Sequence, residues 1–216
     1  MNKLEQYLNL ASRAYYSGAP IISDDQFDRL AESIGYNAVG AKQHGNVERH
    51  VYQMYSLQKY YEDEDQKRPL EGISDVVTTA KLDGAAISLL YVDGNLVRAL
   101  TRGDGVEGQI ITDKILSHTG LVPHIIPPTG VYQVTGEIVA PNHIENSRNY
   151  AAGSLNLKDI NEFKTRALSF FAYGVQPSLA PTFDADLAEL KKHGFGVINE
   201  LNLDKIFPCD GLVFRV

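Results

Sequence analysis

Two short apolar runs, 85–91 and 96–101, flank the dipeptide Asp93-Gly94. This arrangement predicts a tight β-hairpin, because Asp and Gly tolerate the left-handed backbone that a two-residue turn requires. Turn residues separate further short runs that are typical of strands, at 76–80, 131–140, 168–175 and 212–216. A helix is expected over 184–193, with Gly194 at its end. The larger part of the chain is therefore predicted to be an α+β domain with a mostly antiparallel sheet.

The first 35 residues have a different pattern. Apolar residues recur at helical spacing from Leu4 to Tyr15 and again from Phe27 to Ile34. Ser23, followed three residues later by Gln26, is a capping-box signature for the second helix. A polar, glycine-containing stretch follows at 37–46. We therefore expect a small N-terminal helical hairpin domain at residues 1–45 and a second domain at residues 46–216.

The charge and cysteine content exclude several classes of protein. A formal net charge of −7 argues against a surface that binds nucleic acid throughout, because such surfaces carry an excess of Lys and Arg. Any contact with DNA would need a local basic patch or segments outside this chain. The single cysteine, Cys209, excludes an internal disulfide, and no secretory signal or membrane-spanning run is recognisable. We expect a cytoplasmic protein without membrane contact.

The sharpest local pattern is Lys81-Leu82-Asp83-Gly84, which precedes the first strand of the hairpin. Alone, this pattern is also typical of a plain strand-to-turn transition. Five further motifs follow it in order: 101–105 (TRGDG), 135–138 (TGEI), 146–155 (NSRNYAAGSL), 170–174 (FFAYG) and 210–216 (DGLVFRV). The series resembles the nucleotidyltransferase domain of the NAD-dependent DNA ligases of bacterial and phage type, which has an ATP-grasp-like adenylation fold.

The N-terminal part resembles the small helical domain that only the NAD-dependent ligases carry. That domain binds the nicotinamide mononucleotide (NMN) half of NAD, and the resemblance assigns this role to Tyr15, Tyr16, Asp24 and Asp28. Ser56 and Leu57, together with His50 and Met54, resemble the segment that opens the nucleotidyltransferase domain. We expect Ser56 and Leu57 to contribute to nucleotide binding.

The resemblance implies that Lys81 takes AMP from NAD as a lysyl-AMP intermediate. A neutral lysine amine can attack the α-phosphorus and later serve as a leaving group. A free lysine has a pKa of about 10.4, so burial or nearby cations must favour the neutral amine. Arg102, Arg148 and Arg215 would supply such a positive field and would also neutralise charge on the pyrophosphate.

Acidic and aromatic residues complete the implied site. Glu137 would bind the ribose hydroxyls or a metal ion, and Asp83 and Asp210 would lie on the same acidic side. Mg²⁺, with Glu137 and Asp210 as ligands, is implied by the resemblance and by the general needs of nucleotidyl transfer. Tyr173 resembles the aromatic residue on which adenine stacks. The sequence contains no self-sufficient metal cage.

Some features depart from the family pattern. Phe27 stands where tyrosine is usual, Thr79 where glutamate is frequent, Asn156 where a second arginine is expected, and Arg215 where lysine is usual. The chain also lacks the last lysine motif and the oligonucleotide-binding fold, and its stretch 195–208 is compressed, as in a minimal viral ligase. We expect either a fragment or a subunit that a second ligase chain completes, acting on nicked double-stranded DNA.

Two other interpretations remain open. An ATP- or GTP-using relative, such as an RNA ligase or a capping enzyme, would share the lysine motif. Labelling with ATP in preference to NAD would favour it. A nucleotide-binding subunit that regulates a split ligase would bind NAD without forming an adduct.

Overall fold

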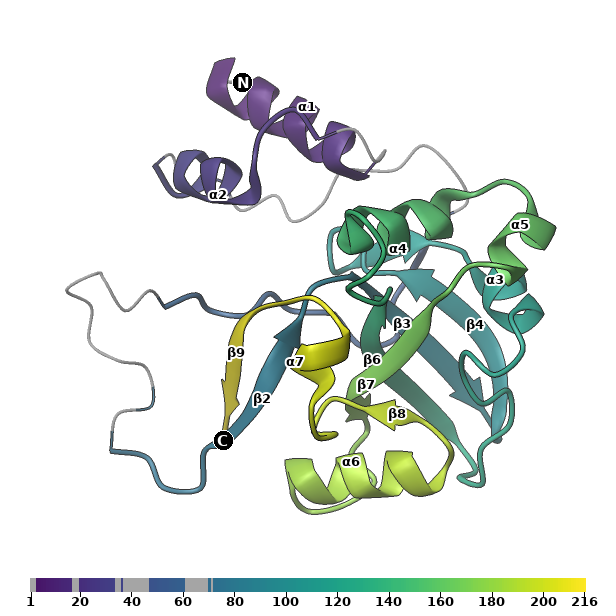
Figure 1. Cartoon of the computed structure of the whole chain (residues 1–216). Helices are drawn as coiled ribbons and strands as arrows, with labels where there is room; N and C mark the ends of the chain where they lie inside the picture. Colours follow the sequence, from purple (N-terminus) through teal and green to yellow (C-terminus); the bar gives the residue numbers. More distant parts are fainter. Residues whose placement is uncertain (1–2, 17–19, 34–35, 37–46, 61–69, 71) are drawn as a thin grey trace.

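The central element of the fold is a five-stranded sheet. The computed structural model describes residues 3–16, 20–33, 36, 47–60, 70 and 72–216. Neighbouring strands of the sheet are antiparallel, except for the last two, which are parallel. The sheet order is β4 (Asn95–Thr101), β3 (Ala85–Val92), β6 (Val131–Val139), β7 (Ser169–Gln176) and β8 (Gly196–Val197). This mixed, mostly antiparallel architecture agrees with the predicted α+β class (Figure 1).

Asp93 and Gly94 form the turn between β3 and β4, as predicted. Both residues have positive φ, 46° and 80°, which the mirror-image hairpin turns require at two successive positions. Gly94 also lies against neighbouring backbone, because a Cβ there would be 2.4 Å from the carbonyl oxygen of Ile126. Both conformation and space therefore require glycine at this position.

A two-stranded ribbon of β2 (Val77–Leu82) and β9 (Cys209–Arg215) stands beside the central sheet (Figure 1). The sequence predicted that the first strand ends at Ala80 and that the second begins at Leu212. Both predictions were wrong at these ends, because β2 continues to Leu82 and β9 already begins at Cys209. Lys81 and Asp210 therefore lie within the ribbon. Pairing between the strands satisfies the backbone groups of these polar residues, and local sequence does not reveal such pairing. A second small sheet pairs β1 (Val47–Arg49) with β5 (Glu107–Gln109).

Helix α6 (Phe183–Lys192) packs on β7 and β8, and it confirms the helix predicted over 184–193. Thr182 is its N-cap residue, and the Thr182 side chain accepts a hydrogen bond from the backbone N–H of Ala185. Leu187 and Leu190 have no exposed surface, so they fix the helix to the sheet.

The sequence did not predict four other helices: α3 (Thr112–Ser117), α4 (Ser147–Asn156), α5 (Ile160–Lys164) and α7 (Leu203–Ile206). Three of them are six residues or shorter, too short for a helical period to emerge. Helix α4 is rich in Ser, Asn and Gly, which are poor helix formers. Its buried residues Ala151 and Leu155 hold it against the core. In Figure 1, α4 and α6 lie on opposite sides of the sheet.

The apolar core lies around β3 and β6, where Ile87, Val134 and Ile138 have no exposed surface. Gly136 of β6 lies against the ring of Phe170, since a Cβ at this position would be 2.3 Å from the ring Cζ. Close packing of this kind leaves the strands little freedom to shift. The ends of β3 and β6 therefore form a rigid base for polar side chains.

Two helices precede the sheet, α1 (Lys3–Tyr16) and α2 (Asp24–Ser33), and they contact each other. The backbone N–H of Ser23 donates to Gln26 Oε1, and the backbone N–H of Gln26 donates to Ser23 Oγ, which confirms the predicted capping box. Ile34 and the connector 37–46 lie outside the described residues, so the domain boundary stays a prediction. No helix in the described ranges is both long and apolar enough to cross a bilayer.

Candidate active site

Lys81 and Asp210 face each other across the β2–β9 ribbon. Lys81 Nζ lies 2.6 Å from each oxygen of the Asp210 carboxylate, and both side chains are about 40% exposed. Lys81 pairs with Gly211 and Leu82 pairs with Cys209, so Asp210 is an extra residue in a β-bulge. A bulge turns a side chain away from its regular direction, and here it accompanies the contact with the lysine.

One face of the ribbon points toward the site. Directly paired residues lie on the same face of a sheet, and so do alternate residues of a strand. Lys81 therefore shares its face with Thr79, Val213 and Arg215, all of which are buried or half-buried. Their neighbour Phe214 is 56% exposed on the other face. Thr79, which stands where the family frequently has glutamate, is therefore buried beside Lys81 on this face. A glutamate at this position would need a hydrogen-bond donor or a cation to pair with its carboxylate.

Glu137 of β6 carries the most strongly shifted carboxyl group of the site. Burial raises the pKa of Glu137 to about 8, while the positive charge of Lys81 opposes the shift and the negative charge of Asp83 adds to it. Arg148 and Arg102 also lower the pKa of Glu137, so both lie close to it. The structure therefore brings four other predicted site residues together around the half-buried carboxyl group of Glu137.

Tyr173 of β7 is the second site residue that lies in a bulge. Thr135 pairs with Gly174 and Gly136 pairs with Ala172, so Tyr173 is the extra residue between them. Burial raises the pKa of the Tyr173 hydroxyl, and the nearby charge of Glu137 raises it further. The ring therefore lies beside Glu137, where the sequence predicted a surface for the base.

Asp83 connects the site to the N-terminal helices. Its carboxylate forms an ion pair with Arg148 of α4, with 3.0 Å between Oδ1 and Nε. The Arg148 guanidinium in turn lies over the ring of Tyr15 of α1, 4.8 Å from the ring centroid. A cleft of about 490 Å³ opens here, lined by Tyr15, Ser23, Asp83 and Arg148, among others. This volume lies in the usual range for small-molecule sites.

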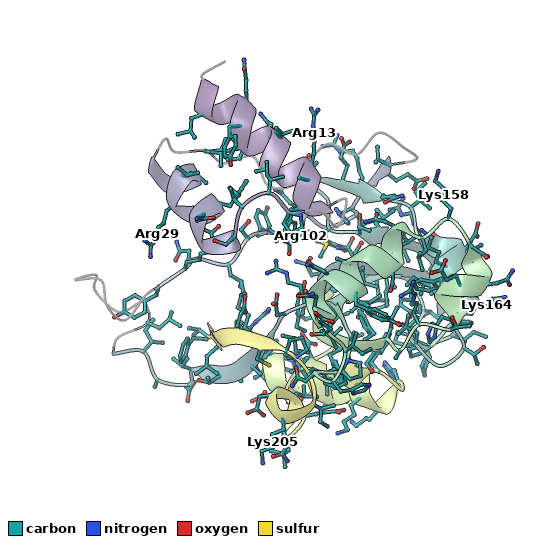
Figure 2. The ribbon with its side chains drawn as sticks, turned by 45° about the horizontal axis from the view of Figure 1, so that its top comes forward. Arg13, Arg29, Arg102, Lys158, Lys164 and Lys205 are labelled. Atoms are coloured by element: carbon teal, nitrogen blue, oxygen red, sulfur yellow. The ribbon has the colours of Figure 1, made fainter. Side chains whose placement is uncertain are left out.

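Arg102 follows β4 and is tied to the segment that precedes the ribbon. Its Nη2 donates a hydrogen bond of 2.8 Å to Ser56 Oγ. His50 Nε2 lies 3.0 Å from the carbonyl oxygen of Arg102, so Nε2 is the protonated nitrogen and Nδ1 accepts from the Ser88 hydroxyl. Burial lowers the pKa of His50, which favours this neutral form. Figure 2 shows Arg102 near the middle of the view, far from the periphery.

The segment from His50 to Ser56 has a second anchor that the sequence did not predict. Gln133 is 2% exposed, and its side-chain amide makes two hydrogen bonds with the backbone of Tyr52. The backbone N–H of Met54 donates to the carbonyl oxygen of Gly105. A glutamine inside an apolar strand was the available signal, since a buried amide needs partners.

Arg215 stacks between two aromatic rings. Its guanidinium carbon lies 4.8 Å from the ring centroid of Phe183 and 5.7 Å from that of Tyr173. Burial lowers the pKa of Arg215. The sequence singled out Arg215 and Tyr173 but missed Phe183, because no local pattern places the start of α6 beside the end of β9.

Some predicted residues lie apart from this cluster or cannot be placed. Asp28 of α2 forms an ion pair with Lys59, and Leu57 is 48% exposed. The side chains of Tyr16 and Asp24 lie outside the described residues. Asn156 is exposed, and its amide reaches back to the carbonyl oxygen of Ala152 on its own helix. Within the described ranges, no group of three or more His, Cys, Asp or Glu side chains could hold a metal ion.

A family model describing the NAD-dependent DNA ligase adenylation domain matches residues 43–207. These residues make up more than half of the chain and include Lys81, Glu137 and Tyr173. The chain belongs to this family. The adenylation domain thus holds the cluster around Glu137, while α1 and α2 precede the matched residues.

Named relatives resemble this adenylation domain and the helices before it. The DNA ligase of Helicobacter pylori strain J99 is 29% identical over 242 residues, which cover 93% of the chain and 37% of that protein. The DNA ligase of Wolbachia pipientis from Culex pipiens is 28% identical over 264 residues, which cover 99% of the chain and 40% of that protein. The chain spans about two fifths of the length of these relatives.

Proposed function

We propose that this adenylation domain transfers AMP from NAD to Lys81 and releases NMN. The observation that carries the proposal is the position of the Lys81 amine, in contact with Asp210 and close to Glu137. The site combines an amine nucleophile, an acceptor for its proton and a group of arginines. Transfer of an adenylyl group needs each of these parts.

The proposed step begins with the loss of a proton. This proton leaves Lys81 Nζ for the Asp210 carboxylate, which already accepts two hydrogen bonds from it. The neutral amine attacks the α-phosphorus, a nitrogen–phosphorus bond forms, and the nitrogen releases its second proton to solvent. The bond between this phosphorus and the bridging oxygen breaks, and NMN departs with that oxygen. The product is a phosphoramidate, lysyl-AMP, at position 81.

The remaining site residues would bind the two parts of AMP. Arg102 and Arg215 would stabilise negative charge on the phosphates during transfer, because fixed cations act strongly in a partly enclosed site. Glu137 would accept hydrogen bonds from the ribose hydroxyls, and Tyr173 would stack on the adenine. The proximity of Tyr173 and Glu137 supports the last two roles, since adenine and ribose are adjacent in the nucleotide.

The NMN half would occupy the cleft between α1 and α4. Tyr15 and Arg148 line this cleft next to Asp83, so the NMN phosphate could meet a cation beside the reacting amine. We propose that α1 and α2 form the NMN-binding helical domain, with Tyr16, Asp24 and Asp28 as further contacts. Asp28 would exchange its partner Lys59 for the ligand.

The described residues do not form a complete protein cage for a magnesium ion, which commonly relies on one or two carboxylates together with substrate phosphates. Asp210 is occupied by Lys81, and no cluster of three metal-ligating side chains exists within the described ranges. Glu137 and Asp210 stay the proposed ligands for Mg²⁺, while the proton transfer and the attack at phosphorus use groups of the protein.

The lysyl-AMP step would be the first in sealing nicks in double-stranded DNA. The chain covers about two fifths of the DNA ligases it resembles, so the later steps are proposed for a larger assembly. DNA contact would come mainly from segments that this chain does not contain, and a second ligase subunit is one source of them. Size-exclusion chromatography of the native complex tests this arrangement by showing whether a partner chain co-elutes.

Intact-protein mass spectrometry after incubation with NAD and Mg²⁺ tests the proposed function. We expect a covalent AMP adduct in the wild type and none in Lys81→Ala. Lys158→Ala is the matched control, because Lys158 is exposed at the periphery of the molecule in Figure 2. A parallel incubation with ATP tests the ATP-using alternative. Absence of an NAD adduct, where a known NAD-dependent ligase labels fully, would contradict the proposal.

A further inference from the structure

Arg215 is a half-buried cation that contacts two aromatic rings. Its guanidinium lies between the rings of Phe183 and Tyr173, 4.8 Å and 5.7 Å from their centroids. Among the residues that the structure describes, no carboxylate forms an ion pair with Arg215 and no side chain accepts a hydrogen bond from it. Burial of a cation without an anionic partner is costly, which agrees with the lowered pKa of Arg215.

Phe183 is held on a firm support. It is the first residue of α6, and the N-cap hydrogen bond of Thr182 fixes the backbone at this point. The segment before it is tied to the same helix, because the backbone N–H groups of Leu179 and Ala180 both donate to Asp186 Oδ1 at 2.7 Å. Arg215 comes from the β2–β9 ribbon and Phe183 begins α6, so the contact between the guanidinium and the ring links these two elements.

Stacking uses the faces of a guanidinium and leaves its edges available. The rings attract the cation through their negative faces, while the N–H groups point outward in the guanidinium plane. Those N–H groups can donate two parallel hydrogen bonds to a phosphate. A lysine ammonium has no plane to orient, so an aromatic neighbour could not aim its hydrogen bonds in this way.

We propose that Phe183 is a positioning residue, which holds the plane of Arg215 so that its N–H groups meet the phosphate of the adenylyl group. The proposal rests on the function proposed above and extends it to a residue outside the recognised motifs. It also explains how arginine works where the family usually has lysine. Phe183 acts only through Arg215 and contacts no reacting atom.

A double-mutant cycle on AMP binding tests the proposal. In the wild-type background, Phe183→Leu should weaken AMP binding about 3- to 10-fold, which corresponds to the loss of one partly desolvated cation–π contact. Phe183→Tyr keeps a ring at the same place and should bind AMP within about twofold of wild type. In the Arg215→Lys background, Phe183→Leu should change binding by less than about twofold, because no guanidinium plane is left to orient.

Isothermal titration calorimetry with AMP measures each arm on the full chain, and thermal melts verify that each variant is folded. A purely structural role for Phe183 predicts equal losses in the wild-type and Arg215→Lys backgrounds, and that result would overturn the proposal. Unchanged binding in Phe183→Leu, or no AMP binding by the wild type, would also overturn it.

AMP binding does not require the chemical step, so the two proposals can fail separately. A wild type that binds AMP and shows the expected coupling, but forms no adduct with NAD, would refute the proposed function and keep the role of Phe183. A normal NAD adduct without coupling between Phe183 and Arg215 would refute only the positioning role. If both proposals hold, Phe183→Leu should raise the KM for NAD more than it lowers kcat.

Discussion

Gly84, the last residue of the lysine motif, offers a test of how tightly the site is built into the sheet. It lies just before β3, where β3 meets the end of β6. A Cβ at position 84 would be 2.1 Å from the carbonyl oxygen of Ile138 and 2.8 Å from Val139 Cγ1. Real Cβ atoms do not approach within 3.0 Å, so Gly84→Ala must push the two strands apart by about 0.9 Å.

The close contact is with backbone, so no side-chain rotation can relieve it. Ala85 pairs with Ile138, and the strain therefore falls on the first rung of the ladder. Overpacking costs about 1–3 kcal/mol, and a weakened hydrogen bond adds about 1 kcal/mol. We expect Gly84→Ala to lower the free energy of unfolding by about 2–4 kcal/mol.

Urea denaturation followed by circular dichroism measures this free energy. The slope of the unfolding free energy against urea concentration should stay unchanged if the substitution does not affect the unfolded state. Gly211→Ala is the matched control, because Gly211 also flanks Lys81 and a Cβ there would meet no atom within 4 Å. This control should stay within about 0.5 kcal/mol of wild type. Equal stability of Gly84→Ala and Gly211→Ala would refute the steric reasoning.

Three further predictions concern neighbouring side chains. The unfolding free energy of the wild type should fall as pH rises from 4.5 toward 8, because folded Glu137 keeps its proton up to about pH 8 while the unfolded carboxyl ionises near 4.5. Urea denaturation at a series of pH values measures this profile. Glu137→Gln should remove this part of the pH dependence. Asp210→Asn should slow adduct formation with NAD about 100-fold in a mass-spectrometric time course, through loss of the proton acceptor at Lys81, yet change stability by less than about 1 kcal/mol since the pair is exposed. Gln133→Ala should cost about 1–3 kcal/mol in the same denaturation assay, because two backbone groups of Tyr52 lose their partner; unchanged stability would contradict this.

Local turn and cap chemistry made much of the fold predictable. Asp93-Gly94 and the Ser23 to Gln26 capping box are recognisable because the residues that cause each structure adjoin in sequence. The helix at α6 was predictable for the same reason, from its apolar spacing and Gly194. Helix α4 was not, because its Ser, Asn and Gly content conceals a helix that packing against the core stabilises.

The sequence singled out several residues of the candidate site but did not predict its geometry. Motif order identified Lys81, Glu137 and Tyr173, which the structure brings together. The contacts of Lys81 with Asp210 depend on the strand register across 129 residues of sequence separation, and no local pattern encodes it. Phe183 was missed for the same reason, since it begins α6 while its neighbour Arg215 lies at the end of β9.

Two of the register shifts, at Asp210 and Tyr173, serve the candidate site and are not needed for regular strand pairing. At Asp210 and at Tyr173 the chain is one residue longer than regular pairing needs, and the strands resume their alternation on either side. A chain shortened by either residue would restore an uninterrupted ladder and keep every flanking side chain on its own face. Such a deletion would remove the lysine's acceptor or the aromatic surface while sparing the scaffold, so in this architecture chemistry can be lost without loss of folding.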